Sequence, residues 1–369
     1  MKKLPMILLA LLAAACIVAL PFLCTHSDIL PEVSTAYYEQ KAQKEALTAT
    51  GPEAELMRML LGLSADTEVE PVRTPIRFSW FGLYLAIGTF IAICALLSNK
   101  QHDLRSALLW TSALAVPFGL IGARLVYALV NIPFYLNAIS APEAMLKVWE
   151  GGLSLTGALA FIVLAGVIGA KLGNARIAEV LDALASPLLV LAGFFCIGIG
   201  QSDIGFGPEI GSSFLAVTIN GAYRLNTPLL VALVLLIITI AAATLSKNAP
   251  AGHYFALTAF LYGSVMILME SLREDGHMVW GFVHAEMVFD LCFALPALLY
   301  LAKTKKRVLL SLLSTAVLAG AVVALEFALD RSAIGDGLLY LVYAAVLAGY
   351  LALGCCFARK RPFPSESCG

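Results

Sequence analysis

The feature that most constrains this chain is a series of apolar segments, each long enough to cross a bilayer. Ten are present, at 4–23, 79–98, 106–130, 153–170, 180–201, 227–246, 253–271, 280–302, 308–326 and 337–358. A spanning helix needs about 20 largely apolar residues, and lipid favours helices because their backbone groups bond within the segment. With 60% apolar and 13% charged residues, a soluble globular domain and a disordered chain are both excluded. The sequence predicts an all-α, polytopic membrane helical bundle of about ten transmembrane helices.

The basic residues predict the orientation of these helices. If Lys2 and Lys3 are cytoplasmic, alternating the spans places the other short basic clusters on the same side, namely Lys100 with Arg105, Lys171 with Arg176, Lys247, Lys303–Arg307 and Arg359–Arg361. Both termini are then cytoplasmic, as expected for a multi-pass protein of a bacterial-type plasma membrane. The segments 25–78, 131–152, 202–226 and 272–279 face the outer side.

Other features narrow the functional classes. The net charge of -1 provides no basic field for nucleic acid, and the eight cysteines form no C-x-x-C pair, so neither a disulfide framework nor a metal site is expected. Lys2, Lys3 and the run Ala13–Cys16 resemble a lipoprotein signal with a cleavable cysteine. Because apolar residues continue past Cys16 to Leu23, we expect a membrane anchor in this segment.

The segment 25–78 is the one long polar stretch. Tyr37–Thr48 is predicted to form a polar helix, and Glu53–Leu63 an amphipathic helix with leucines at helical spacing. The segment is either a small outer cap or interfacial helix, or a flexible tether.

Ionisable residues inside spans are costly and therefore mark candidate functional positions. Glu270 and Arg273 share a helix face and can form a local ion pair. Glu286 and Asp290 would repel one another if both were ionised, so either one holds a proton or a cation such as Arg124 lies between them.

The predicted topology gathers polar residues at the outer membrane boundary. They are Glu150 with Gly151 and Gly152, Asp203, Glu270, Arg273 and His277, with Arg124 deeper in the bundle. Arginines hold phosphate and glycines allow close approach, so an outward-facing site for an anionic lipid headgroup is expected.

Five segments resemble the prolipoprotein diacylglyceryl transferase family, in the order in which that family has them. They are IRFSWFGLYLAIG at 76–88, GARLVY at 122–127, WEGGLSLTG at 149–157, Asp182 with Pro187, and LYGSVMILMESLR at 261–273. The resemblance covers residues 76–302 and implies a seven-helix core. It also implies the transfer of diacylglycerol from phosphatidylglycerol to the lipobox cysteine of a lipoprotein precursor, without metal or organic cofactor.

The chain departs from this family's motifs where the chemistry is expected. Thr156 stands in place of a histidine and Phe81 in place of a tyrosine, while Cys196 and Met266 stand in place of arginines. In the signature at 195–207, Gly198 and Gly207 match the family. Either the site binds a less charged lipid part, or catalysis relies on other residues.

The sequence therefore leaves three hypotheses: a divergent diacylglyceryl transferase, a non-catalytic lipid- or prolipoprotein-binding member of the same fold, and a transporter or assembly partner. If the chain is an enzyme, the catalytic candidates are Glu270, Asp203 and His277. The substrate-binding candidates are Arg124, Arg273, Glu150, Gly152, Thr156, Gly198 and Gly207. We expect four parts: an anchor at 1–24, an extracytoplasmic polar segment at 25–75, a transferase-like core at 76–302, and two extra helices with a basic tail at 303–369.

Overall fold

The computed structural model describes residues 3–25, 28–64, 67–99, 101–202, 204–247, 249–331 and 335–359. Within these residues, nine helices are long and apolar enough to cross a membrane. They are α4 (Trp80–Leu97), α5 (Arg105–Val130), α6 (Leu155–Leu172), α7 (Ile177–Gly200), α8 (Thr227–Leu245), α9 (His253–Ser271), α10 (Ala285–Ala302), α11 (Lys305–Arg331) and α12 (Asp336–Arg359). The apolar helix α1 (Lys3–Leu23) precedes them. The predicted all-α membrane bundle is confirmed.

The membrane helices pack mainly in pairs. Helix α5 packs along α6, α4 along α7, and α9 along α10. Helices α11 and α12 pack against each other and against the α9–α10 pair. The α5–α6 pair approaches closely because two glycines face each other. A side chain at Gly122 or at Gly157 would come within 2.5 Å of the other residue's carbonyl oxygen. Small residues at such crossings let helix backbones approach closely in a membrane.

Short hairpins and tight turns connect the helices. Strands β1 (Ala216–Ile219) and β2 (Ala222–Leu225) are antiparallel, with Ala216 opposite Leu225. Asn220 and Gly221 have φ of 51° and 85°, which suits the asparagine–glycine turn of a two-residue hairpin. A second hairpin joins β3 (Val279–Trp280) to β4 (Val283–His284), so α10 begins at Ala285 and not at the predicted residue 280. Single turns lie at His102–Leu104, Phe134–Ala138, Pro142–Leu146 and Val148–Glu150.

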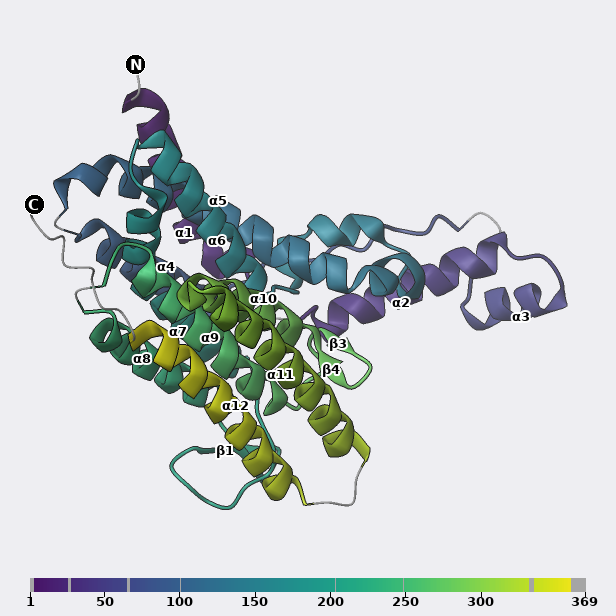
Figure 1. The fold of residues 1–369 in the computed structure, drawn as a ribbon. Coiled ribbons are helices and arrows are strands. Elements are labelled where there is room, and N and C mark those ends of the chain that lie inside the picture. The colour runs from purple at the N-terminus through teal and green to yellow at the C-terminus, as the bar shows by residue number, and fades with distance from the viewer. Residues whose placement is uncertain are drawn as a thin grey trace, which may run out of the picture.

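The polar segment 25–78, which we call the cap, contains two helices that extend beyond the bundle (Figure 1). These are α2 (Pro31–Thr48) and α3 (Pro52–Leu60), in the regions where the sequence predicted a polar and an amphipathic helix. Arg58 holds α3 against α2 by donating to the carbonyl oxygens of Ala46 at 2.7 Å and Ala49 at 2.6 Å.

The cap packs on the bundle through a small core of its own. Val33 and Tyr37 of α2 are buried there with Tyr127 and Tyr135, and with Ile139 of the loop after α5. Helix α2 therefore packs on the bundle, whereas the outer location of the segment stays a prediction.

The first turn of α1 and the last turn of α12 lie at the same end of the bundle, away from the hairpins (Figure 1). This arrangement agrees with the two termini being on one side of the membrane. Which side faces the cytoplasm stays a prediction from the basic residues.

Candidate functional site

Arg124 ties the loop between α5 and α6 to the bundle. Its side chain is buried and donates to the carbonyl oxygens of Met145 at 2.8 Å, Ala144 at 2.5 Å, Gly152 at 2.9 Å and also Gly151. Four acceptors occupy most of the five N–H groups of a guanidinium. Arg124, which the sequence predicted to bind phosphate, therefore donates most of its hydrogen bonds to backbone carbonyls of the protein itself.

Gly151 and Gly152 permit this loop to approach its neighbours. Both have positive φ, at 91° and 81°, a conformation that other residues adopt at a cost. A Cβ atom at Gly151 would overlap the backbone carbonyl of Asp28 in the cap, and one at Gly152 would overlap the ring of Tyr127. The two glycines are needed where the cap and α5 meet the loop.

Glu150 links the loop to the cap. The carboxylate is fully buried and accepts from the Tyr37 hydroxyl at 3.0 and 3.2 Å and from the Thr74 hydroxyl at 3.0 Å. The ammonium of Lys147 lies 3.4 Å from Glu150 and donates to the Tyr37 oxygen at 2.6 Å. Burial, and then the charge of Glu150, raise the pKa of Tyr37, so this phenol stays a donor at neutral pH.

Arg273 lies between two carboxylates at the C-terminal end of α9. Its guanidinium is 3.1 Å from Glu270 and 2.6 Å from Asp275. Burial alone would raise the pKa of Asp275, but Arg273, together with His277 and His284, outweighs burial and holds that pKa below its usual value. The predicted pairing of Glu270 with Arg273 is present in the structure, and Asp275 completes a triad in which Arg273 is fully compensated.

His277 pairs with a carboxylate from the cap. Its Nδ1 is hydrogen-bonded to Asp28, and its ring stacks on Tyr127 with centroids 5.4 Å apart. Burial lowers the pKa of His277, but the charge and hydrogen bond of Asp28 outweigh this effect, so the pKa lies above its ordinary value. An imidazole oriented by a carboxylate on Nδ1 is the arrangement that general bases use.

This pair predicts a pH dependence. A histidine with a raised folded-state pKa stabilises the folded chain fully below its unfolded pKa of about 6.5, and this contribution is lost as the pH rises through the folded-state value. We expect the thermal unfolding midpoint of the wild type in detergent to fall as the pH rises above about 6.5. For His277→Gln, the midpoint falls less over the same range. Equal slopes for the two proteins would contradict the assignment.

Thr156, which replaces the family histidine, faces a carboxylate. Its hydroxyl donates to Glu286 of α10, and the Ser154 hydroxyl donates to the other oxygen of Glu286 at 2.7 Å. Ser154 also caps α6 by accepting from the amide of Gly157 at 3.0 Å. Both hydroxyls are therefore already engaged within the protein.

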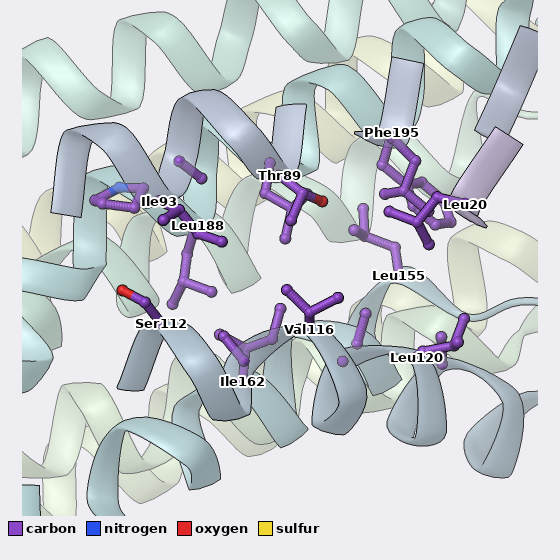
Figure 2. A pocket seen from close by; sticks show the side chains of 18 of the residues that line it. Leu20, Thr89, Ile93, Ser112, Val116, Leu120, Leu155, Ile162, Leu188 and Phe195 are labelled. Atoms are coloured by element: carbon purple, nitrogen blue, oxygen red, sulfur yellow. The ribbon is translucent and has the colours of Figure 1, made fainter. Parts of the chain in front are cut away.

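An apolar chamber lies between α4 and α7 on one side and α5 and α6 on the other. Its cavity volume is about 70 Å³, and the empty space reaches about 780 Å³ when the open side is counted. Thr89, Leu188 and Phe195 face Ser112, Val116 and Leu120 across it (Figure 2). Its lining spans residues 112–123 of α5, about 16 Å along a helix axis. That length matches one leaflet of the hydrocarbon core, which is about 15 Å thick.

One face of α5 connects the chamber with the polar residues just described. We call these residues the polar cluster: Glu150, Glu270, Arg273, Asp275 and His277, with Asp28 and Tyr37 of the cap. Val116, Gly119 and Ala123 line the chamber, and Tyr127 follows at the next helical interval on the same face. The ring of Tyr127 stacks on His277, and Leu153, next to Gly152, also lines the chamber. The aspartate–histidine pair therefore lies directly beyond one end of an apolar cavity.

A comparison with known protein families shows to which family this chain belongs. The sequence matches the family described as prolipoprotein diacylglyceryl transferase over residues 71–303, more than half of the chain. This chain belongs to that family. Proteins named phosphatidylglycerol–prolipoprotein diacylglyceryl transferase, from Staphylococcus aureus strains MSSA476 and USA300, are each 26% identical over 221 residues. The match covers 56% of this chain and 77% of each relative.

Two members of the polar cluster lie outside the region that matches the transferase family. Asp28 and Tyr37 precede residue 71, yet they contact His277 and Glu150 within the matched region. The sequence offered no signal for either contact, because the partners are 249 and 113 residues apart.

Apart from Thr156, the positions at which this chain departs from the family motifs, Phe81, Cys196 and Met266, are apolar and buried. Phe81 and Phe195 pack edge to face with centroids 5.1 Å apart, and Cys196 and Met266 are buried in the main core. Gly198 lies against Phe81, and Gly207 against Thr227 and the carbonyl of Leu272, so both permit close packing. Asp203 lies outside the described residues.

Proposed function

We propose that this chain acts on a glycerophospholipid of the outer leaflet, with phosphatidylglycerol as the lipid and a lipoprotein precursor as the acceptor. The observation that supports the proposal is the shared face of α5, along which the apolar chamber is followed by Tyr127 and the aspartate-paired His277. Membership of the transferase family supports the choice of lipid and acceptor.

The reaction fits the groups that are present. The thiol of the acceptor cysteine loses its proton to the free ring nitrogen of His277, while Asp28 stabilises the imidazolium that forms. The thiolate attacks the glyceryl carbon, a carbon–sulfur bond forms, the carbon–oxygen bond to phosphate breaks, and glycerol phosphate leaves. The proton then passes from His277 to the medium.

A specific observation favours a second candidate, a non-catalytic lipid-binding role. Around the stack of Tyr127 and His277, the described cations already have partners. Arg124 lies over the Tyr127 ring and donates to loop carbonyls, Arg273 is paired with Glu270 and Asp275, and His277 is paired with Asp28. None of these cations is left without a partner to attract the phosphate of a leaving group. Lipid binding through the acyl chains needs no such attraction.

The orientation is part of the proposal. We place both termini in the cytoplasm and the polar cluster with its cap on the outer side, because the short loops rich in lysine and arginine then all face inward. Residues 76–302 form the lipid-handling core, and residues 303–359 add the helix pair that leans against α9 and α10.

One experiment tests both candidates. Purified protein in vesicles containing acyl-labelled phosphatidylglycerol receives a lipobox peptide, and both lipid binding and thioether product are measured beside an active family member. Filling the chamber with Val116→Phe should lower both signals by about tenfold, which corresponds to about 1.4 kcal/mol. The matched variant Ile121→Phe alters the exposed side of the same helix and should change neither signal.

The two readouts separate the outcomes. Transfer that His277→Gln removes, with lipid binding intact, supports the transferase. Binding that depends on Val116, with no product at high protein concentration, supports the second candidate. Equal lipid binding by Val116→Phe and Ile121→Phe would contradict both candidate functions, because the chamber would then not be the lipid site.

A further inference from the structure

Three carboxylates lie within the bundle on the helices α9 and α10. Glu270, Glu286 and Asp290 are 6%, 3% and 0% exposed. An ionised carboxylate in such surroundings needs a counter-charge or several hydrogen bonds, because burying an uncompensated charge is costly. The partners of each carboxylate therefore indicate which of them carries a charge.

Two of the three have partners. Glu270 is paired with Arg273 at 3.1 Å. Glu286 accepts from the hydroxyls of Ser154 and Thr156, and hydrogen bonds of this kind stabilise a charged carboxylate. Arg124, which the sequence suggested as a cation between Glu286 and Asp290, is bound to loop carbonyls instead.

Asp290 differs from both. Within the part of the chain that the structure describes, neither of its oxygens has a hydrogen-bond partner. The hydroxyl of Tyr262 on α9 is also buried and without a partner. The two helices touch at this level, because a side chain at Gly263 would overlap the carbonyl of Asp290.

The surrounding charges make an ionised Asp290 still less favourable. The groups that act electrostatically on it are Glu270 of α9, and Glu286 and Cys292 of its own helix, and none of these is a cation. Tyr262 of α9 in turn experiences Asp290, Glu286, Glu270 and Cys196 of α7. A negative charge on Asp290 would thus add to two carboxylates that already have their partners.

We propose that Asp290 is a proton-binding site inside the membrane bundle: a neutral carboxylic acid that holds one exchangeable proton. No proposed step of lipid transfer uses this group, so the inference stands apart from the proposed function. It resolves the alternative that the sequence left open for Glu286 and Asp290, with Asp290 as the protonated member.

Infrared spectroscopy of the full chain in lipid nanodiscs tests the proposal. A protonated carboxylic acid has a carbonyl stretching band well separated from that of a carboxylate. At about pH 8, where an ordinary aspartate is ionised, the wild type should show this band, and it should shift on transfer to deuterated water. The band should disappear in Asp290→Asn and persist in the matched variant Glu286→Gln.

Three results would overturn the proposal. One is a band that survives in Asp290→Asn, and another is a band that Glu286→Gln removes. The third is a band that adding sodium ions abolishes at constant pH, which would make the site one for a metal cation. A thermal unfolding midpoint close to that of the wild type confirms that Asp290→Asn is folded, and the near-identical shape of asparagine favours this.

Discussion

Replacing Arg124 with alanine is expected to lower the stability of this protein more than any other single change proposed above. The substitution removes the Arg124 donor from the carbonyl oxygens of Met145, Gly151 and Gly152. The Ala144 carbonyl also loses Arg124 but still accepts from the Lys147 amide at 3.1 Å. Each buried acceptor that loses its partner costs about 1–3 kcal/mol. Even if water reaches some of them, we expect a loss of at least about 3 kcal/mol in the free energy of unfolding.

The measurement is the thermal unfolding midpoint in detergent, which should fall by at least about 5 °C. Arg105→Ala is the matched control, since Arg105 is an exposed arginine at the start of the same helix, and it should change the midpoint little. Arg124→Lys keeps the charge but not the planar set of donors, and it should fall between the two. A stable Arg124→Ala protein that loses only lipid affinity would instead show that the arginine serves the ligand.

The second large effect is expected for Gly151→Ala. An alanine there must adopt a positive φ, which costs about 1–3 kcal/mol. Its Cβ would also overlap the backbone carbonyl of Asp28, which no side-chain rearrangement can relieve. We therefore expect the cap to separate from the loop and to become sensitive to protease between residues 28 and 64, while the membrane helices remain folded.

A substitution at Gly221 separates the cost of a positive φ from the effect of the overlap with the cap. Gly221 has a φ of 85°, close to the 91° of Gly151, yet nothing lies within 4 Å of the place where its Cβ would stand. Gly221→Ala should therefore carry the conformational cost without opening the cap. If the two variants are cleaved at equal rates, contact with the cap is not what requires glycine at position 151.

Much of the bundle could be predicted from the sequence because a helix that crosses lipid needs about 20 largely apolar residues. All ten apolar segments are helical in the structure, including 280–302, which contains three ionisable residues. Apolar composition does not predict the residue at which a helix begins or ends, because the residues of the adjoining turn determine this. The β3–β4 hairpin, with Gly281 at a φ of 67°, delays the start of α10 to residue 285.

The candidate site was less accessible to sequence reasoning. Charge and depth were enough to single out Arg124, Arg273 and His277, and the pairing of Glu270 with Arg273 follows from their spacing on one helix. The ligands of Arg124 are backbone carbonyls, and any residue can provide these. Asp28 looked like one acid among several in a polar stretch, and only the fold brings it to His277.

The origin of the cap residues has a practical consequence. A chain trimmed to the region shared with its relatives would begin at residue 71 and would lack Asp28 and Tyr37. Glu150 would then lose its phenol donor, and the imidazole of His277 would lose its carboxylate. A version trimmed to residues 71–303 would retain helices α4 to α10 but lose α1, α11 and α12. Its activity would not represent that of the full chain, because the missing segment completes the polar cluster from outside the shared domain.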